Sequence, residues 1–143
     1  MCGICGSAGF VDRDALGRMT GALVHRGPDD GGVYVDAAAG IGLGNRRLAI
    51  LDLSANGHMP MTSAQTGVTI TYNGEVYNYR ALRRELAAHG HSFISGSDTE
   101  VILRDYKRAT RSGEGLSARL NGIFALALWD PRANSTPRRG TSP

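Results

Sequence analysis

The sequence lacks any long hydrophobic run. Its longest apolar stretch near the end covers residues 123–129 and is too short to cross a bilayer as a helix. The first residues also lack a basic segment followed by an apolar run, so we expect no signal peptide, a cytoplasmic location and no membrane association. Cysteine is scarce, and Cys2 and Cys5 are too few and too close in sequence to form a disulfide framework.

The sequence before residue 130 also lacks an excess of charge of either sign. The 143 residues carry 16 basic and 13 acidic side chains, for a net charge of +3. Three of the arginines lie in residues 130–143, so the preceding part is close to neutral. Because nucleic-acid binding needs concentrated basic charge, we expect no nucleic-acid partner.

The apolar spacing predicts one mixed α and β domain over residues 2–130, with a largely antiparallel sheet. Asn73-Gly74 directly follows an alternating strand and predicts a hairpin turn, with residues 75–77 returning as the partner strand. Asn78 is expected to cap the helix that follows, and Asp12 or Asp14 is expected to cap the first helix. Residues 33–35 and 41–43, joined by residues 36–40, predict a second hairpin. The expected strands cover residues 4–10, 33–35, 41–43, 45–52, 68–72, 75–77, 91–94 and 123–129, and the expected helices cover about residues 14–26, 79–89, 98–109 and 116–120.

The N-terminal residues offer a nucleophile and a base on one residue. Cys is small enough for Met1 to be excised, which would leave Cys2 with both a thiol and a free α-amine. The unperturbed pKa values are about 8.5 for the thiol and about 7.7 to 8.0 for the amine, so the amine can accept the thiol proton near neutral pH. Cys2 is therefore a candidate catalytic residue, although a small residue on a terminal strand is the plainer interpretation.

Four polar clusters lie at expected strand ends and turns. Each also has a structural interpretation: a helix end, a solvated edge, a hairpin turn and a helix cap, in chain order. The clusters are His25-Arg-Gly-Pro-Asp-Asp30, Asn45-Arg-Arg-Leu-Ala-Ile-Leu-Asp52, Asn73-Gly-Glu-Val-Tyr-Asn78 and Gly96-Ser-Asp-Thr-Glu100.

In order and spacing, Cys2 and these clusters resemble the glutamine amidotransferase domain of the glutamine-hydrolysing asparagine synthetase family. That domain is a class II amidotransferase, a branch of the N-terminal nucleophile hydrolases, and the resemblance covers about residues 2–130. It implies an α+β fold built as a four-layer α/β/β/α sandwich. It also implies hydrolysis of the side-chain amide of L-glutamine, with the ammonia supplied to asparagine-type amide synthesis.

The resemblance implies catalytic roles for matching residues. Cys2 would attack the glutamine carbonyl and form an acyl-enzyme that water cleaves. The Asn73 side chain and the Gly74 backbone N–H would donate to the oxyanion of the tetrahedral intermediate. Arg26 would support the nucleophile by orientation and electrostatics.

The resemblance also implies a binding site for the amino-acid part of glutamine. Arg47 would bind the α-carboxylate, for which a planar guanidinium is well suited. Asp98 would bind the α-ammonium, and Glu75 would contribute to the same pocket. The remaining contacts would come from Leu48, Ala49, Ile50 and Leu51 in the wall and from Asn73 and Gly74.

The sequence departs from the family after Asp130. Residues 131–143 have low complexity and no large apolar side chain, so we expect a disordered tail and a sandwich that is incomplete at its C-terminus. The ATP-dependent synthetase domain of the family has no counterpart here. We therefore expect no cofactor and no metal in this chain, since ATP and magnesium would belong to that missing domain.

Two other functions stay open. The first alternative to an active glutaminase is an inactive truncated remnant or a glutamine-binding subunit that needs a separate synthetase partner. Turnover of glutamine would indicate the enzyme, and binding of glutamine without turnover would indicate this alternative. A redox or metal protein using Cys2 and Cys5 is the second alternative, but a structural zinc site takes four ligands.

Overall fold

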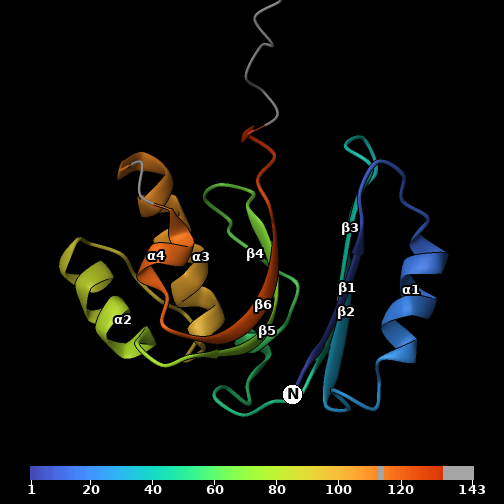
Figure 1. The fold of residues 1–143 in the computed structure, drawn as a ribbon, viewed down its shortest axis with the longest axis horizontal. Helices are drawn as coiled ribbons and strands as arrows, with labels where there is room; N and C mark the ends of the chain where they lie inside the picture. Colours follow the sequence, from blue (N-terminus) through green and yellow to red (C-terminus); the bar gives the residue numbers. More distant parts are fainter. Residues whose placement is uncertain (113–114, 134–143) are drawn as a thin grey trace, which may run out of the picture.

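The computed structural model describes residues 1–112 and 115–133 and contains two three-stranded antiparallel sheets between helices (Figure 1). All strand pairs are antiparallel. The elements in chain order are β1 (Gly3–Ser7), α1 (Arg13–Ala22), β2 (Asp30–Asp36), β3 (Ile41–Arg47), a 3₁₀ turn (Ala55–Gly57), β4 (Met61–Thr62), β5 (Thr69–Val76), α2 (Tyr79–Ala88), α3 (Asp98–Ser112), α4 (Leu116–Arg119) and β6 (Gly122–Trp129).

The first sheet has the strand order β1-β3-β2, and α1 covers its outer face (Figure 1). The predicted hairpin is confirmed, because β2 and β3 pair along their length and Asp36 lies opposite Ile41. Of the two residues predicted to cap α1, Asp12 and Asp14, Asp12 is the one that does so. Its carboxylate accepts from the N–H groups of Asp14 and Ala15 at 2.9 and 3.2 Å, which satisfies donors that the first helical turn leaves free.

The second sheet has the order β4-β5-β6, and α2, α3 and α4 lie on its outer face (Figure 1). Leu82 and Leu86 of α2 are buried, as their helical spacing predicts. The main apolar core consists of Met59, Val68, Ile70, Tyr72, Val76, Leu82, Leu86, Val101, Ile102 and Leu103. The four-layer α+β arrangement predicted from the sequence is confirmed (Figure 1).

Buried polar contacts join the facing sheets. Asn45 is fully buried on β3, and its Nδ2 donates to Thr71 Oγ1 at 3.1 Å and to the Tyr72 carbonyl at 3.2 Å, both on β5. Thr71 Oγ1 in turn donates to the Gly44 carbonyl at 3.0 Å. These bonds from Asn45 Nδ2 and Thr71 Oγ1 fix how the sheets lie on each other, although Asn45 Oδ1 is buried without a hydrogen-bond partner among the described residues.

The predicted hairpin turn at Asn73-Gly74 is wrong. β5 runs straight through both residues, because β6 pairs with it from Thr69 to Val76. Gly74 has a φ of +149°, and a Cβ there would collide with the Ile123 carbonyl and with Phe124. The glycine thus allows β6 to lie close to β5 and does not form a turn.

Two predicted strand segments are also absent: residues 48–52, the second part of the strand predicted over 45–52, and residues 91–94. β3 ends at Arg47, where its neighbours begin, so residues 48–52 have no strand to pair with and form a loop. Residues 91–94 are irregular, and the Ile94 N–H donates to the Glu100 carboxylate instead of to a strand. Local propensity was overridden in both places by the lack of a pairing partner.

The cap predicted for α2 forms without its side-chain bond. Asn78 Nδ2 instead donates to the Arg119 carbonyl at 2.9 Å, and Oδ1 accepts from the Asn121 N–H at 3.0 Å. Asn78 therefore ties the start of α2 to the segment between α4 and β6.

The greater part of the predicted tail, residues 134–143, lies outside the described residues. The domain boundary at residue 130 stays a prediction. Within the described part of the chain, no helix combines the length and apolar character needed to cross a membrane.

Candidate active site

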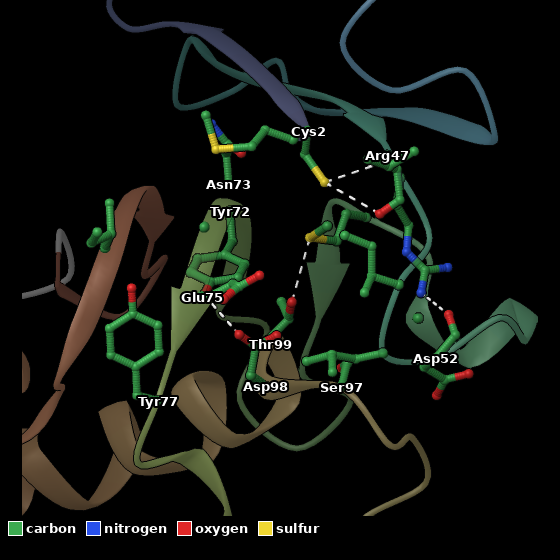
Figure 2. Close-up of a pocket in the computed structure, with 18 residues that line it drawn as sticks. Cys2, Arg47, Asp52, Tyr72, Asn73, Glu75, Tyr77, Ser97, Asp98 and Thr99 are labelled. Atoms are coloured by element: carbon green, nitrogen blue, oxygen red, sulfur yellow. Dashed lines mark hydrogen bonds between the residues drawn. The ribbon is translucent and has the colours of Figure 1, made fainter.

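A cavity of about 300 Å³ lies where the ends of the two sheets meet the start of α3 (Figure 2). Cys2 directly precedes β1, Arg47 ends β3, β5 contributes residues 72–75, and α3 contributes its first turn. The lining residues are Met1, Cys2, Arg47, Leu48, Ile50, Leu51, Asp52, Gly57, Met59, Tyr72, Asn73, Gly74, Glu75, Tyr77, Ser97, Asp98, Thr99 and Ile123.

The pairing of β1 with β3 places Cys2 in this cavity. Gly3 lies opposite Arg46, so the preceding residue lies beside the end of β3. Cys2 Sγ accepts from the Leu48 N–H at 3.4 Å and lies 3.8 Å from the Leu48 carbonyl oxygen (Figure 2). The Leu48 backbone therefore contacts the sulfur through both its N–H and its carbonyl oxygen.

Arg26 holds the backbone of the same residue. Its Nε donates to the Cys2 carbonyl at 3.1 Å, so the guanidinium lies beside the nucleophile without contacting Sγ. A Cβ at Gly27 would collide with the backbone of Arg46 and Arg47, so the glycine lets the Arg26 segment lie against β3. These contacts hold the Arg26 side chain against the backbone of Cys2, and its supporting role in catalysis stays a prediction.

Arg47 is buried at the end of β3 and turns its side chain toward the loop of residues 48–57. Its guanidinium donates to the carbonyls of Asp52 and Ser54. Gly57 lies against the same group, and a Cβ there would collide with Nη2. A guanidinium has five N–H donors, so two carbonyl partners leave donors for a carboxylate.

Asn73 and Gly74 line the cavity from β5. Asn73 Oδ1 is buried and has no hydrogen-bond partner among the described residues. A buried amide oxygen without a partner is rare in folded proteins and marks a position where another group belongs. Figure 2 shows Asn73 and Cys2 on the same side of the cavity.

Asp98 is buried at the first turn of α3, where the positive end of the helix dipole favours a carboxylate. Its Oδ2 accepts from the Tyr72 hydroxyl at 2.7 Å and from the Val76 N–H at 3.2 Å. Burial raises the pKa of Tyr72 far above its usual value, and the hydrogen bond to Asp98 adds to this, so Tyr72 stays a protonated donor. A carboxylate accepts up to about four hydrogen bonds, which leaves Asp98 capacity for a cationic ligand.

The predicted wall is only partly in place. Leu48, Ile50 and Leu51 line the cavity, and so does the exposed Glu75. Ala49 does not line it, and its N–H donates to the Asp29 carboxylate at 2.8 Å.

Asp52 closes the loop of residues 48–57 against the segment before α3. Its Oδ1 accepts from the Ser54 hydroxyl and N–H at 2.6 and 2.8 Å, and its Oδ2 accepts from the Gly96 N–H at 2.8 Å. The Ser54 hydroxyl bond and the Gly96 N–H bond are the main causes that lower the pKa of this carboxyl. Asn56 Nδ2 adds a bond to the Ile94 carbonyl at 3.1 Å.

Several lining residues were missed by the sequence analysis. Tyr72, Asp52 and Ser97 each lie within or directly beside a polar cluster that was recognised, so proximity to those clusters was the available signal. Thr99 also lies within the recognised cluster of residues 96–100, whereas Met59 carried no such signal, because it lies in a loop without apolar periodicity.

Cys5 does not line the cavity that contains Cys2. Its Sγ lies 3.4 Å from Thr20 Oγ1 of α1, and both cysteines are free thiols. In residues 1–112 and 115–133, no three His, Cys, Asp or Glu side chains are grouped as metal ligands.

Sequence comparison relates the chain to amidotransferases. A family model described as a glutamine amidotransferase domain matches residues 1–137. Asparagine synthetase 3 (glutamine-hydrolyzing) of Bacillus subtilis is 42% identical over 141 residues, which cover 94% of this chain and 22% of that protein. The asparagine synthetase (glutamine-hydrolyzing) of Sandersonia aurantiaca is 39% identical over 140 residues, covering 94% of this chain and 25% of its own length. The chain thus spans about a quarter or less of these relatives.

Structural comparison gives the fold. The glutamine phosphoribosylpyrophosphate amidotransferase from B. subtilis, complexed with ADP and GMP, superimposes with a TM-score of 0.69 at 16% identity. The match covers 91% of this chain and 35% of that one. This likeness confirms the predicted sandwich of the N-terminal nucleophile hydrolase type.

Proposed function

Because the chain belongs to the glutamine amidotransferase domain family, we propose that it hydrolyses the side-chain amide of L-glutamine with Cys2 as the nucleophile. The observation that carries the proposal is the meeting of four chemistries in one cavity. A thiol at Cys2, a cation at Arg47, an amide at Asn73 and a carboxylate at Asp98 come from distant parts of the sequence and line the same space.

The reaction begins once Met1 has been removed. Met1 is 70% exposed, so its peptide bond to Cys2 is accessible to an aminopeptidase. The freed α-amine takes the thiol proton, and the thiolate attacks the side-chain carbonyl carbon of glutamine. Asn73 Nδ2 and the Gly74 N–H donate to the oxyanion that forms.

The intermediate then collapses. The carbon–nitrogen bond breaks, and the departing amine takes the proton from the α-ammonium of Cys2 and leaves as ammonia. Water attacks the thioester, with the α-amine accepting its proton, and glutamate leaves as the thiolate is restored. The Leu48 N–H supports the thiolate at both ends of this cycle, because it donates to Sγ at 3.4 Å.

Glutamine is selected by its amino-acid end. Arg47 binds the α-carboxylate through donors that Asp52 and Ser54 leave unused, and Asp98 binds the α-ammonium through its remaining lone pairs. Glu75 adds negative charge beside the same group. The pocket thereby fixes the distance between the charged end and the amide that Cys2 attacks.

The ammonia is transferred to a synthetase. The relatives matched by this chain carry asparagine synthetase names and are about four times longer or more, which supports a separate synthetase domain or subunit as the acceptor of the ammonia. In this scheme the glutaminase half needs no cofactor or metal, and ATP and magnesium act at the synthetase half. Asparagine-type amide synthesis is the corresponding overall reaction.

Ammonia release from L-glutamine by the purified chain tests the proposal. Mass spectrometry first establishes that Met1 is absent. We expect activity in the unmodified chain, its loss in Cys2→Ala, and its retention in Cys5→Ala. Cys5→Ala is the matched control, because it removes a thiol three residues further along the chain, on β1, at a position that faces Thr20 rather than the cavity.

The opposite results identify the alternatives. Saturable glutamine binding without turnover in the processed chain would favour a glutamine-binding subunit. Equal loss of activity in both cysteine variants would favour a structural or redox role for the thiols. Absence of both binding and turnover in folded, processed protein would contradict the proposed function altogether.

A further inference from the structure

A second cavity, of about 420 Å³, lies between the end of α2 and the middle of α3 and is distinct from the glutamine pocket. The two cavities share no lining residue. Arg104 is six residues beyond Asp98 on the same helix, which places it about 9 Å further along the axis. The residues that line this second cavity are Gln65, His89, Gly90, His91, Ser92, Arg104, Lys107 and Arg108.

The lining of this basic cavity is cationic. Arg104, Lys107 and Arg108 are spaced by three and four residues, so they share one face of α3. His89 and His91 face them from the end of α2, and no carboxylate is among the described residues that line the cavity. Lys107 is also the single lysine of the sequence.

Nearby acids offset this charge incompletely. Glu100 accepts from Arg104 Nη2 at 3.4 Å, which is long for an ion pair. Glu85 pairs with Arg108 but also with Arg119 at 3.0 Å, so its charge is shared. Lys107 Nζ donates a hydrogen bond to the neutral Gln65 Oε1 at 3.2 Å.

One buried donor in the cavity has no partner, and the cationic side chains act on a histidine of its lining. Arg104 Nε is buried and lacks a hydrogen-bond partner within the described structure, a condition that normally marks the position of a water or an ion. The pKa of His91 is lowered, first by burial and then by Lys107, Arg104, His89 and Arg108. The imidazole therefore experiences the combined field of these neighbours.

We propose that this basic cavity binds a small oxyanion of the phosphate type. A phosphate dianion concentrates two charges in a tetrahedral group, and arginine recognises such a group through paired N–H donors. The cavity holds donors on both sides, from α3 and from the end of α2, which suits a compact anion with acceptors in several directions. This site is independent of glutamine hydrolysis and is assigned by charge and shape alone.

The imidazole signals of His91 in proton NMR report directly on this site. Inorganic phosphate is titrated into the full chain at constant ionic strength, with sodium chloride as the balancing salt, and His91→Gln identifies the His91 signals. We expect a saturable shift with a dissociation constant of about 1 mM or below. We also expect the pKa of His91 to rise, because a bound anion stabilises the imidazolium.

Two variants test where the phosphate binds. Lys107→Gln removes one charge inside the cavity and should weaken binding about tenfold, the effect expected for one charge-assisted hydrogen bond. Arg18→Gln removes one charge from the exposed face of α1 and should change the affinity less than twofold. A dispersed NMR spectrum shows that each variant is folded.

The source of the phosphoryl group is distinguished by repeating the titration with adenosine monophosphate. Tighter binding than that of inorganic phosphate assigns a nucleotide, and equal or weaker binding assigns free phosphate. The proposal is overturned if phosphate produces no saturable shift, if chloride alone produces the same shift, or if Lys107→Gln and Arg18→Gln weaken binding equally.

Discussion

Replacement of Asn73 by alanine is expected to abolish most of the turnover while leaving the fold almost unchanged. The side-chain Oδ1 has no hydrogen-bond partner among the described residues, and the pairing of β5 with β6 uses backbone atoms. The change in unfolding free energy should therefore stay within about 1 kcal/mol. Loss of an oxyanion donor costs about 10² to 10³ in kcat, or about 2.7 to 4 kcal/mol of transition-state stabilisation.

Asn78→Ala is the matched control, because it makes the same chemical change five residues along the chain. Asn78 bridges the Arg119 carbonyl and the Asn121 N–H at 2.9 and 3.0 Å and does not line the cavity. Loss of two such bonds should cost about 1 to 3 kcal/mol of stability, with kcat nearly unchanged.

The two variants are compared by kcat for ammonia release at saturating glutamine and by urea unfolding. The reasoning about Asn73 is refuted if Asn73→Ala lowers kcat less than about tenfold. It is equally refuted if that variant loses as much stability as Asn78→Ala, since Asn73 would then be a strand residue with no special role in the reaction.

Three further variants probe the surroundings of the site. Asp52→Asn weakens the bond to the Gly96 N–H, so steady-state kinetics should show KM for glutamine rising about fivefold with little change in kcat; a fall in kcat at constant KM would argue against a binding role. Burial raises the pKa of Glu100, but hydrogen bonds from the preceding loop outweigh burial and hold this pKa below 4.5. The ionised carboxylate therefore contributes fully to stability above about pH 4.5, and this contribution is lost as the pH falls through the folded-state pKa. Glu100→Gln should flatten the dependence of stability on pH below about 4.5 in urea unfolding, and an unchanged slope would contradict this account. Arg119→Leu removes the partner that donates to both oxygens of the fully buried Asp105 at 3.0 Å and should cost about 3 to 5 kcal/mol by thermal unfolding; a loss below about 1 kcal/mol would mean that water replaces the arginine.

The sequence predicted the elements whose patterns are local. The Asp12 cap, the hairpin of β2 and β3, and the helices α2 and α3 all followed from capping residues and apolar spacing, and the structure confirms them. Helices and tight hairpins close their own hydrogen bonds within a few residues, so nearby sequence largely determines them.

Elements that depend on distant partners were predicted less well. Asn73-Gly74 has the composition of a turn, but its conformation is set by β6, which begins nearly fifty residues later. The same holds for residues 48–52 and 91–94, which have strand-like composition and no strand beside them. Ala49 was assigned to the pocket wall by its place in a motif, whereas its N–H is taken by Asp29 from another cluster.

The separation between the nucleophile and the proposed oxyanion donors is a property of sheet packing. Cys2 directly precedes β1 of the first sheet and Asn73 lies in the second sheet, so no local sequence fixes the distance between them. Asn45 supplies that constraint, because it precedes Arg47 by two residues and donates to the carbonyl of Tyr72, the residue directly before Asn73. A misplacement of about 1 Å at a reacting centre can cost about 10² in rate. The buried contact of Asn45 with β5 is therefore as much a part of the site as the residues that would touch glutamine, although no chemical motif reveals it.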